Sequence, residues 1–170
     1  MKKIILSLLV ATSLFGCQSK TENTGNASVS ANSTGYNVSS SDNITLVKKV
    51  LDAGINDDTA TIKATYVDSA FVFDNKTKQT LSENMQTASY LKSKQTTVKI
   101  VSIDNIWESV LNKEDKKGAT SYVHVYLEAA FTRAGKTVSV ELNVVYAIKN
   151  GKILGEWDIY DTAELRDLLK

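Results

Sequence analysis

The stretch that decides the fold is YVHVYLEAAFTRAGKTVSVELNVVYAIKNGKILGEWDIY, which covers residues 122–160. Apolar and polar residues alternate there in three runs, which are separated by Ala134-Gly135 and Asn150-Gly151. A period of two predicts strands that bury one face, and such short Gly-containing links predict two-residue hairpin turns. The stretch therefore predicts an antiparallel meander with strands over Tyr122–Arg133, Val138–Ile148 and Ile153–Tyr160.

These two turns also predict the register, because a two-residue turn fixes which residues lie opposite each other. The predicted pairs are Phe131–Val138, Leu127–Leu142, Val125–Val144, Ile148–Ile153 and Val144–Trp157. They place apolar side chains on one continuous face. The opposite face then collects His124, Tyr126, Glu128, Glu141, Asn143, Glu156, Asp158 and Tyr160.

The residues before the meander supply a further strand and the helices that cover it. A strand is expected over Val98–Val110, followed by a charged loop over Asn112–Ala119. Helical spacing begins at Asn43, with Ser41 or Asp42 as N-cap. A short helix over Thr59–Tyr66, a strand over Ala70–Phe73 and a helix opened by the capping box Thr80–Glu83 follow. The fold class is therefore α+β, with N-terminal helices packed on the apolar face of the sheet.

Two segments resemble a known family. The segment Gly151–Leu165 is similar to the last strand and terminal helix of SnoaL-like members of the NTF2-like superfamily. Phe71–Asp74, with the helix after Thr80, resembles that family's first strand and third helix. The resemblance covers about Asn43–Lys170 and implies a cone: helices over a curved antiparallel sheet, with a pocket between them. Enzymes of the superfamily place a carboxylate base in the cone, whereas binding members lack one.

The predicted register leaves the cone-facing side of the last three strands without an acid. The leading hypothesis is therefore a non-catalytic domain that binds a small apolar ligand or a partner protein. The alternative is a SnoaL-like isomerase, cyclase or hydrolase with Asp104 as the pocket carboxylate and Tyr66 or Tyr90 as its partner. Asp104 faces inward in one register of its strand and outward in the other. A purely structural envelope protein is the third hypothesis.

Other candidate residues fall on the two predicted faces. Tyr146 and Trp157 are expected to line the cone, either as core or as a ligand pocket. Tyr126, Asn143 and Asp158 form a polar row across three strands, which favours a homodimer interface over a ligand site. His124 is either an interface histidine paired with Glu156 or a general base or metal ligand. With one histidine and no free thiol, no metal site is expected.

The first residues resemble a bacterial lipoprotein signal. Lys2 and Lys3 precede an apolar run that is too short to span a bilayer. Leu14-Phe15-Gly16-Cys17 resembles a lipobox, although Phe15 is bulkier than usual. The resemblance implies that Cys17 is lipidated with palmitate-type acyl chains and anchors the protein to a membrane. Gln18 after the cysteine implies the outer membrane of a Gram-negative cell envelope.

Length and composition bound the remaining possibilities. The 170 residues predict a signal peptide over residues 1–16, a flexible Ser-, Thr- and Asn-rich linker over residues 17–41 and one domain over residues 42–170. The net charge of +1 gives no electrostatic basis for nucleic-acid binding. The single cysteine precludes an intrachain disulfide. No cofactor is expected, because no phosphate loop, zinc spacing or EF-hand pattern occurs.

Overall fold

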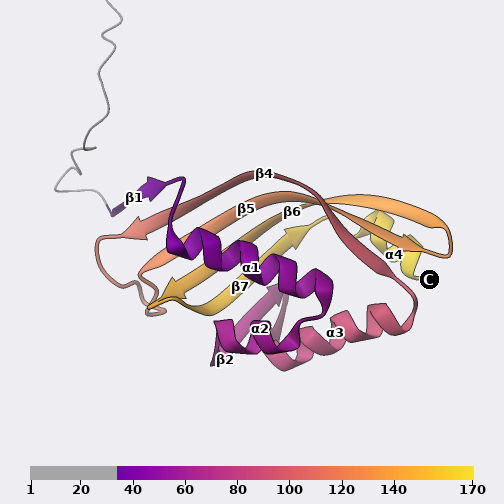
Figure 1. The fold of residues 1–170 in the computed structure, drawn as a ribbon, viewed down its shortest axis with the longest axis horizontal. Helices are drawn as coiled ribbons and strands as arrows, with labels where there is room; N and C mark the ends of the chain where they lie inside the picture. The colour runs from indigo at the N-terminus through magenta and orange to yellow at the C-terminus, as the bar shows by residue number, and fades with distance from the viewer. Residues whose placement is uncertain (1–33) are drawn as a thin grey trace, which may run out of the picture.

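The computed structural model describes residues 34–170, which form one curved sheet covered on one face by helices (Figure 1). The α+β class is confirmed. The signal sequence, Cys17 and most of the linker lie outside the described residues. Within residues 34–170 no helix is both long and apolar enough to cross a membrane.

The sheet has seven strands in the order β1-β4-β5-β6-β7-β2-β3. All neighbours are antiparallel except β2 and β7, which run parallel. This parallel pair brings the start of β2 beside the last strand, which becomes important for the site. The strands are β1 (Gly35–Val38), β2 (Tyr66–Asp74), β3 (Thr77–Thr80), β4 (Thr97–Leu111), β5 (Ser121–Arg133), β6 (Lys136–Lys149) and β7 (Lys152–Tyr160).

The helices are placed by the caps that the sequence supplies. They are α1 (Asp42–Asn56), α2 (Thr59–Thr65), α3 (Leu81–Ser93) and α4 (Ala163–Leu169). The Ser41 side chain accepts a hydrogen bond from the Ile44 amide at the start of α1. Thr80 and Glu83 form the expected capping box of α3. Helices α1, α2 and α3 lie over one face of the sheet (Figure 1).

Both predicted hairpin turns of the meander are confirmed. The two turn residues of each, Ala134-Gly135 and Asn150-Gly151, have positive φ angles, as turns that match the strand twist require. Between β5 and β6 the register follows the prediction along its whole length, including Leu127 opposite Leu142. The apolar residues of these two strands form the core together with α1, whose Val47 is fully buried.

Two features at the edges differ from the sequence-based expectation. Gly35–Val38 lie within the stretch expected to be linker, yet they pair with the end of β4 as strand β1. Strand β4 itself carries two bulges, one between Ile100 and Ser102 and one between Ile103 and Asn105. Each bulge adds a residue without a partner, so strict alternation does not hold along β4.

Candidate active site

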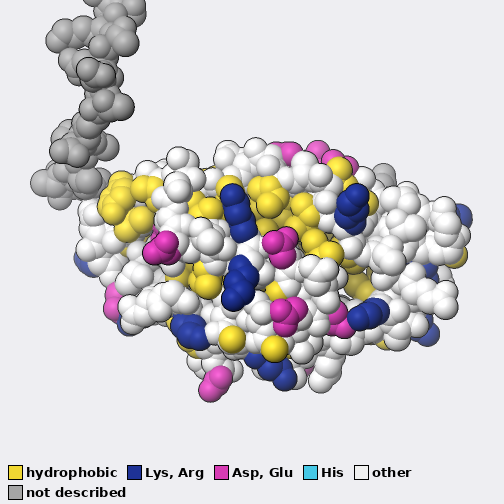
Figure 2. Space-filling model, in the orientation of Figure 1, with side chains coloured by type: hydrophobic (Ala, Val, Ile, Leu, Met, Phe, Trp, Pro, Cys, Tyr) yellow, Lys and Arg dark blue, Asp and Glu magenta, His cyan; other side chains and the backbone are white. Residues whose placement is uncertain are grey.

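A cavity of about 290 Å³ lies between the helices and the concave face of the sheet. Most of its wall is aliphatic. Representative lining residues are Val50 and Leu51 of α1, Ile62 of α2, Met85 of α3, Ile100 of β4 and Leu142 of β6. Figure 2 shows hydrophobic side chains at the surface between the C-terminal half of α1 and the neighbouring strands. The hollow is thus suited to a small, largely apolar molecule.

A β-bulge in β7 decides which of its side chains enter this cavity. Ile148 lies opposite Ile153, as predicted, but Ala147 then lies opposite Gly155. Leu154 is left without a partner, and the alternation of β7 shifts by one residue. A shift by one residue moves every following side chain to the other face of the sheet.

The bulge brings two acids into the cavity. Tyr146 lies opposite Glu156 and Val144 opposite Asp158, so the predicted pairing of Val144 with Trp157 is wrong. Glu156 and Asp158 both line the cavity, whereas the sequence placed them on the outer face. The predicted cone without an acid is therefore wrong as well.

Tyrosine hydroxyls surround Glu156. Tyr66, the first residue of β2, donates a hydrogen bond from its hydroxyl to Oε2 of Glu156. The parallel pairing of β2 with β7 places Tyr66 beside this strand. Tyr146 lies directly across from Glu156 and is only 1% exposed. Burial, with the charge of Glu156, raises the pKa of both tyrosines well above its usual value, so both hydroxyls keep their protons.

The two acids shift each other's protonation. Burial raises the pKa of Glu156, while hydrogen bonds with Tyr66, Asp158 and Tyr146 oppose this by stabilising its carboxylate. Burial raises the pKa of Asp158 to about 10, helped by the charge of Glu156 and a hydrogen bond to it. Neutral Asp158 and ionised Glu156 are thus the arrangement that the surrounding donors favour. The pair shares a proton through neutral pH, as closely spaced carboxyls do.

A further acid lies behind the pair. The hydroxyl of Tyr160 donates to Oδ1 of Asp74 at 2.7 Å. The charge of Asp74 adds to the raised pKa of Asp158.

Within residues 34–170 no group of three or more His, Cys, Asp or Glu side chains is arranged to hold a metal ion.

Solved structures share this architecture. An NTF2-like protein of unknown function from Burkholderia pseudomallei is 14% identical over 77% of this chain and 99% of that one, with a TM-score of 0.57. A candidate polyketide cyclase from Xanthomonas campestris is 10% identical over 76% of this chain and 97% of that one, with a TM-score of 0.56. An LEH-like epoxide hydrolase from M. tuberculosis is 21% identical over 75% of this chain and 90% of that one, with a TM-score of 0.53. The domain has the NTF2-like fold. No protein-family model and no curated protein matches the sequence.

The pocket residues expected from sequence separate onto the two faces of the NTF2-like sheet. Tyr146 lines the cavity. Trp157 lies on the outer face instead, opposite Val145, with its ring stacked on Phe73 at 6.3 Å and edge-on to Phe71 at 5.0 Å. The bulge accounts for this exchange of Trp157 for Glu156 and Asp158.

Asp104 does not reach the cavity of the NTF2-like domain. It sits exposed at the second bulge of β4, where the Ser102 hydroxyl donates to its Oδ1 at 2.7 Å. Of its two expected partners, Tyr90 is 60% exposed on α3, and Tyr66 is bonded to Glu156. The structure therefore brings Tyr66 to a carboxylate, but to one that the sequence had placed elsewhere.

The expected interface residues are only partly brought together. Tyr126 and Asn143 are paired across β5 and β6 on the outer face, while Asp158 lies on the opposite face. His124 shares the outer face, and its ring stacks on Trp107 at 4.7 Å. Burial lowers the pKa of His124. The expected pairing of His124 with Glu156 is wrong, because Glu156 faces the cavity.

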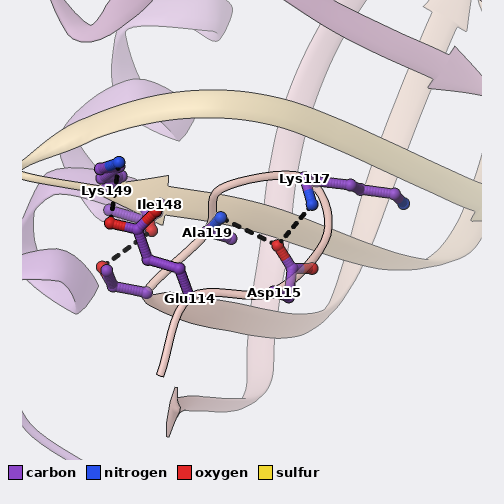
Figure 3. A network of polar contacts seen from close by, with 7 residues as sticks. Glu114, Asp115, Lys117, Ala119, Ile148 and Lys149 are labelled. Atoms are coloured by element: carbon purple, nitrogen blue, oxygen red, sulfur yellow. Dashed lines mark hydrogen bonds and ion pairs between the residues drawn. The ribbon is translucent and has the colours of Figure 1, made fainter. Parts of the chain in front are cut away.

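Polar contacts hold the loop between β4 and β5 in place (Figure 3). Asp115 accepts hydrogen bonds from the backbone amides of Lys117 at 2.8 Å and Ala119 at 2.9 Å. Glu114 forms an ion pair with Lys149 at 2.8 Å. The loop places the Lys117 ammonium 4.2 Å above the ring of Trp157. A cation over an indole face is favourable, so this end of the outer face is covered by the chain itself.

The signal for the missed acids was Gly155. A lone glycine inside a strand pattern often marks a bulge or a close approach of another group. Both apply here, because a Cβ at Gly155 would overlap the ring of Phe71.

Proposed function

We propose that this domain is an acid–base enzyme that transfers protons on a small, largely apolar substrate. One observation carries the proposal: Glu156 and Asp158 lie side by side in an apolar cavity, with the Tyr66 hydroxyl bonded to Glu156. Perturbed carboxyl pairs in clefts are typical of catalytic acid–base groups.

The two acids are suited to different steps. Asp158 holds its proton and can donate a hydrogen bond to a polar atom of the substrate, as a neutral carboxylic acid in an apolar site does. Glu156 is the base that accepts a proton from the substrate. As Glu156 gains a proton, Asp158 returns one to another substrate atom, and the hydrogen bond between them lets the pair recover its starting state. The aliphatic walls lower the local dielectric constant and so strengthen these interactions.

Neighbouring structures give independent support for this kind of chemistry. They include a candidate polyketide cyclase and an epoxide hydrolase. Cyclisation, isomerisation and epoxide opening all need proton transfer to or from a small organic substrate. The non-catalytic hypothesis depended on a cone without acids, whereas Glu156 and Asp158 line the cavity.

Deuterium exchange tests the proposal with a panel of small organic compounds. Small monocyclic ketones, aminoketones and epoxides are incubated with the full chain in D₂O, and ¹H NMR follows exchange and product formation. Exchange or turnover of at least one compound is expected, with loss in Glu156→Gln and Asp158→Asn. Asp104→Asn removes an exposed carboxylate outside the cavity and serves as the matched control. Activity that persists in both cavity variants would contradict the proposal.

We further propose that the enzyme is held on the cell envelope by lipidated Cys17. The supporting observation is the sequence resemblance of residues 1–17 to a lipoprotein signal. Two or three acyl chains anchor a protein firmly, since each buried CH₂ contributes about 0.8 kcal/mol. The outer membrane of a Gram-negative bacterium is the proposed location.

The outer face of the sheet is the proposed contact with a second copy. Tyr126 is 47% exposed there and stacks on the ring of Trp107, and Ile159, on β7 of the same face, is 54% exposed. Exposed aromatic and aliphatic side chains of this kind are enriched in protein interfaces. The partner is a second copy of this chain, paired face to face across β5 and β6.

A further inference from the structure

The charged residues that line the cavity are all acidic. Among the described lining residues, Asp57, Glu156 and Asp158 carry ionisable acids, and no Lys, Arg or His is present. Asp57 lies at the end of α1 and is neutralised by an ion pair with Lys92 at 2.5 Å. The deep pair of Glu156 and Asp158 has no such cation among the described lining residues.

The hydrogen-bond donors around the pair favour a carboxylate at Glu156 inside the cavity. Hydrogen bonds from Tyr66 and Tyr146 stabilise an ionised Glu156 without neutralising it. A charge that is removed from water and left without a counter-ion is costly. A ligand with a positive charge would therefore be bound more favourably than an isosteric neutral one, and an anion would be repelled.

Aromatic rings add to this preference. Tyr66, Tyr146 and Phe131 all line the same cavity as the acids. Aromatic rings attract cations through their quadrupole, and most strongly where water is excluded. Carboxylate together with aromatic rings is the composition that suits an alkylammonium group.

We propose that the ligand of this cavity is a small apolar amine that binds as its ammonium cation. The inference rests on the proposed function, since it names the substrate class of the same carboxyl pair. The volume of about 290 Å³ lies at the lower end of the range for small-molecule pockets, which favours a ligand with a compact apolar part. The ammonium donates hydrogen bonds to the Glu156 carboxylate, and the hydrocarbon part packs on the aliphatic wall.

Three probes that share one cyclohexane ring test the charge preference on the full chain. Cyclohexylamine, cyclohexanol and cyclohexanecarboxylate share one ring and differ in charge, and their affinities are measured by calorimetry at neutral pH. The amine is expected to bind at least about tenfold more tightly than the alcohol, and the carboxylate more weakly than the alcohol. Equal affinity for amine and alcohol, or tightest binding of the carboxylate, would overturn the proposal.

Variants locate the preference. Glu156→Gln removes the carboxylate charge, so the affinities for the amine and the alcohol should come within about twofold of each other. Binding of the alcohol to this variant shows that the cavity is still formed. Asp104→Asn should leave the ratio unchanged. A full amine preference in a Glu156→Gln protein that still binds the alcohol would overturn the proposal.

The two proposals fail in different ways. Loss of exchange activity in the cavity variants without amine selectivity would support the enzyme and refute the substrate class. Amine selectivity in a protein whose cavity variants keep full exchange activity would support an amine as the ligand and refute the acid–base enzyme.

Discussion

At the scale of single residues, the balance of burial and hydrogen bonding determines how the cavity acids behave. Glu156 and Asp158 lie within an apolar wall, where burial raises the pKa of both. Tyr66 and Tyr146 supply hydroxyl donors to one of them only. The asymmetry between the two carboxyls, rather than the presence of acids as such, suits the pair to the separate acid and base roles that we propose.

Asp158→Asn should change how stability depends on pH. Folding raises the pKa of Asp158 from 3.8 to about 10, so the folded state binds the extra proton across the neutral range. The extra proton contributes to the free energy of unfolding. This stabilisation is fully present below the unfolded pKa and is lost as pH rises towards the folded pKa, by up to about 1.4 kcal/mol per pH unit. Urea unfolding between mildly acidic and mildly alkaline pH should show a smaller decline for the variant than for the wild type.

The control for this measurement is Asp104→Asn, because Asp104 is exposed on β4 and does not line the cavity. Its pH profile should follow the wild type. A wild-type profile that stays flat, or one that Asp158→Asn leaves unchanged, would show that Asp158 does not carry the proton assigned to it.

At the scale of elements, one extra residue in β7 determines the character of the cavity. Leu154 has no partner across β6, and Gly155 follows it beneath the ring of Phe71. Without the bulge, Trp157 would face the helices and the acids would face outward. The position of a single bulge therefore decides whether the cavity is wholly apolar or contains two acids.

Gly155→Ala should destabilise the domain by about 1–3 kcal/mol, because its methyl group would overlap the Phe71 ring and force β2 or β7 to move. Gly54→Ala is the matched control: no atom lies within 4 Å of a Cβ there, and alanine in a helix gains about 0.5–1 kcal/mol over glycine. Chemical denaturation of the two variants gives the comparison. Equal stability of both would mean that β2 does not pack on β7 at this glycine.

The sequence predicts the elements of this fold well because they follow from local patterns. The two turns, the capping box at Thr80 and the β5–β6 register all depend on neighbouring residues or on uninterrupted alternation. Alternation carries no information once a bulge interrupts it, so the face of Glu156, Asp158 and Trp157 was predicted wrongly. Strand β1 was missed since its pairing partner, the end of β4, is distant in sequence.

At the scale of the whole molecule, the two faces of the sheet in the NTF2-like domain differ in character. The helix-covered face holds the cavity, and the outer face presents Trp107, His124 and Tyr126 as a stacked row. The proposed anchor at Cys17 precedes both in the chain and lies outside the described residues. Substitutions can therefore alter the cavity and the proposed contacts with other molecules separately.

Cys17→Ser should abolish lipidation, because the hydroxyl does not replace the thiol that receives the diacylglyceryl group. Intact-mass analysis of membrane and soluble fractions is expected to give an unprocessed, unacylated chain. Normal maturation of the variant would rule out this anchor.

Tyr126→Arg should weaken self-association by placing a charge in the proposed contact between copies. Tyr36→Arg is the matched control, since Tyr36 is similarly exposed, at 45% against 47%, but lies on the edge strand β1. Native mass spectrometry of the wild type should show a dimer that only the first substitution reduces. A strictly monomeric wild type at high concentration would remove the basis for this contact.

The carboxyl pair in the cavity is tested most directly by a pH titration of the Asp158 and Glu156 carboxyl carbons by ¹³C NMR, assigned with Asp158→Asn and Glu156→Gln. We expect Asp158 to stay protonated through neutral pH and to release its proton only near pH 10. We also expect the titration of Glu156 to change when Asp158 is replaced. Independent titration of both carboxyls near their usual values of 3.8 and 4.5 would contradict a buried, proton-sharing pair in the cavity.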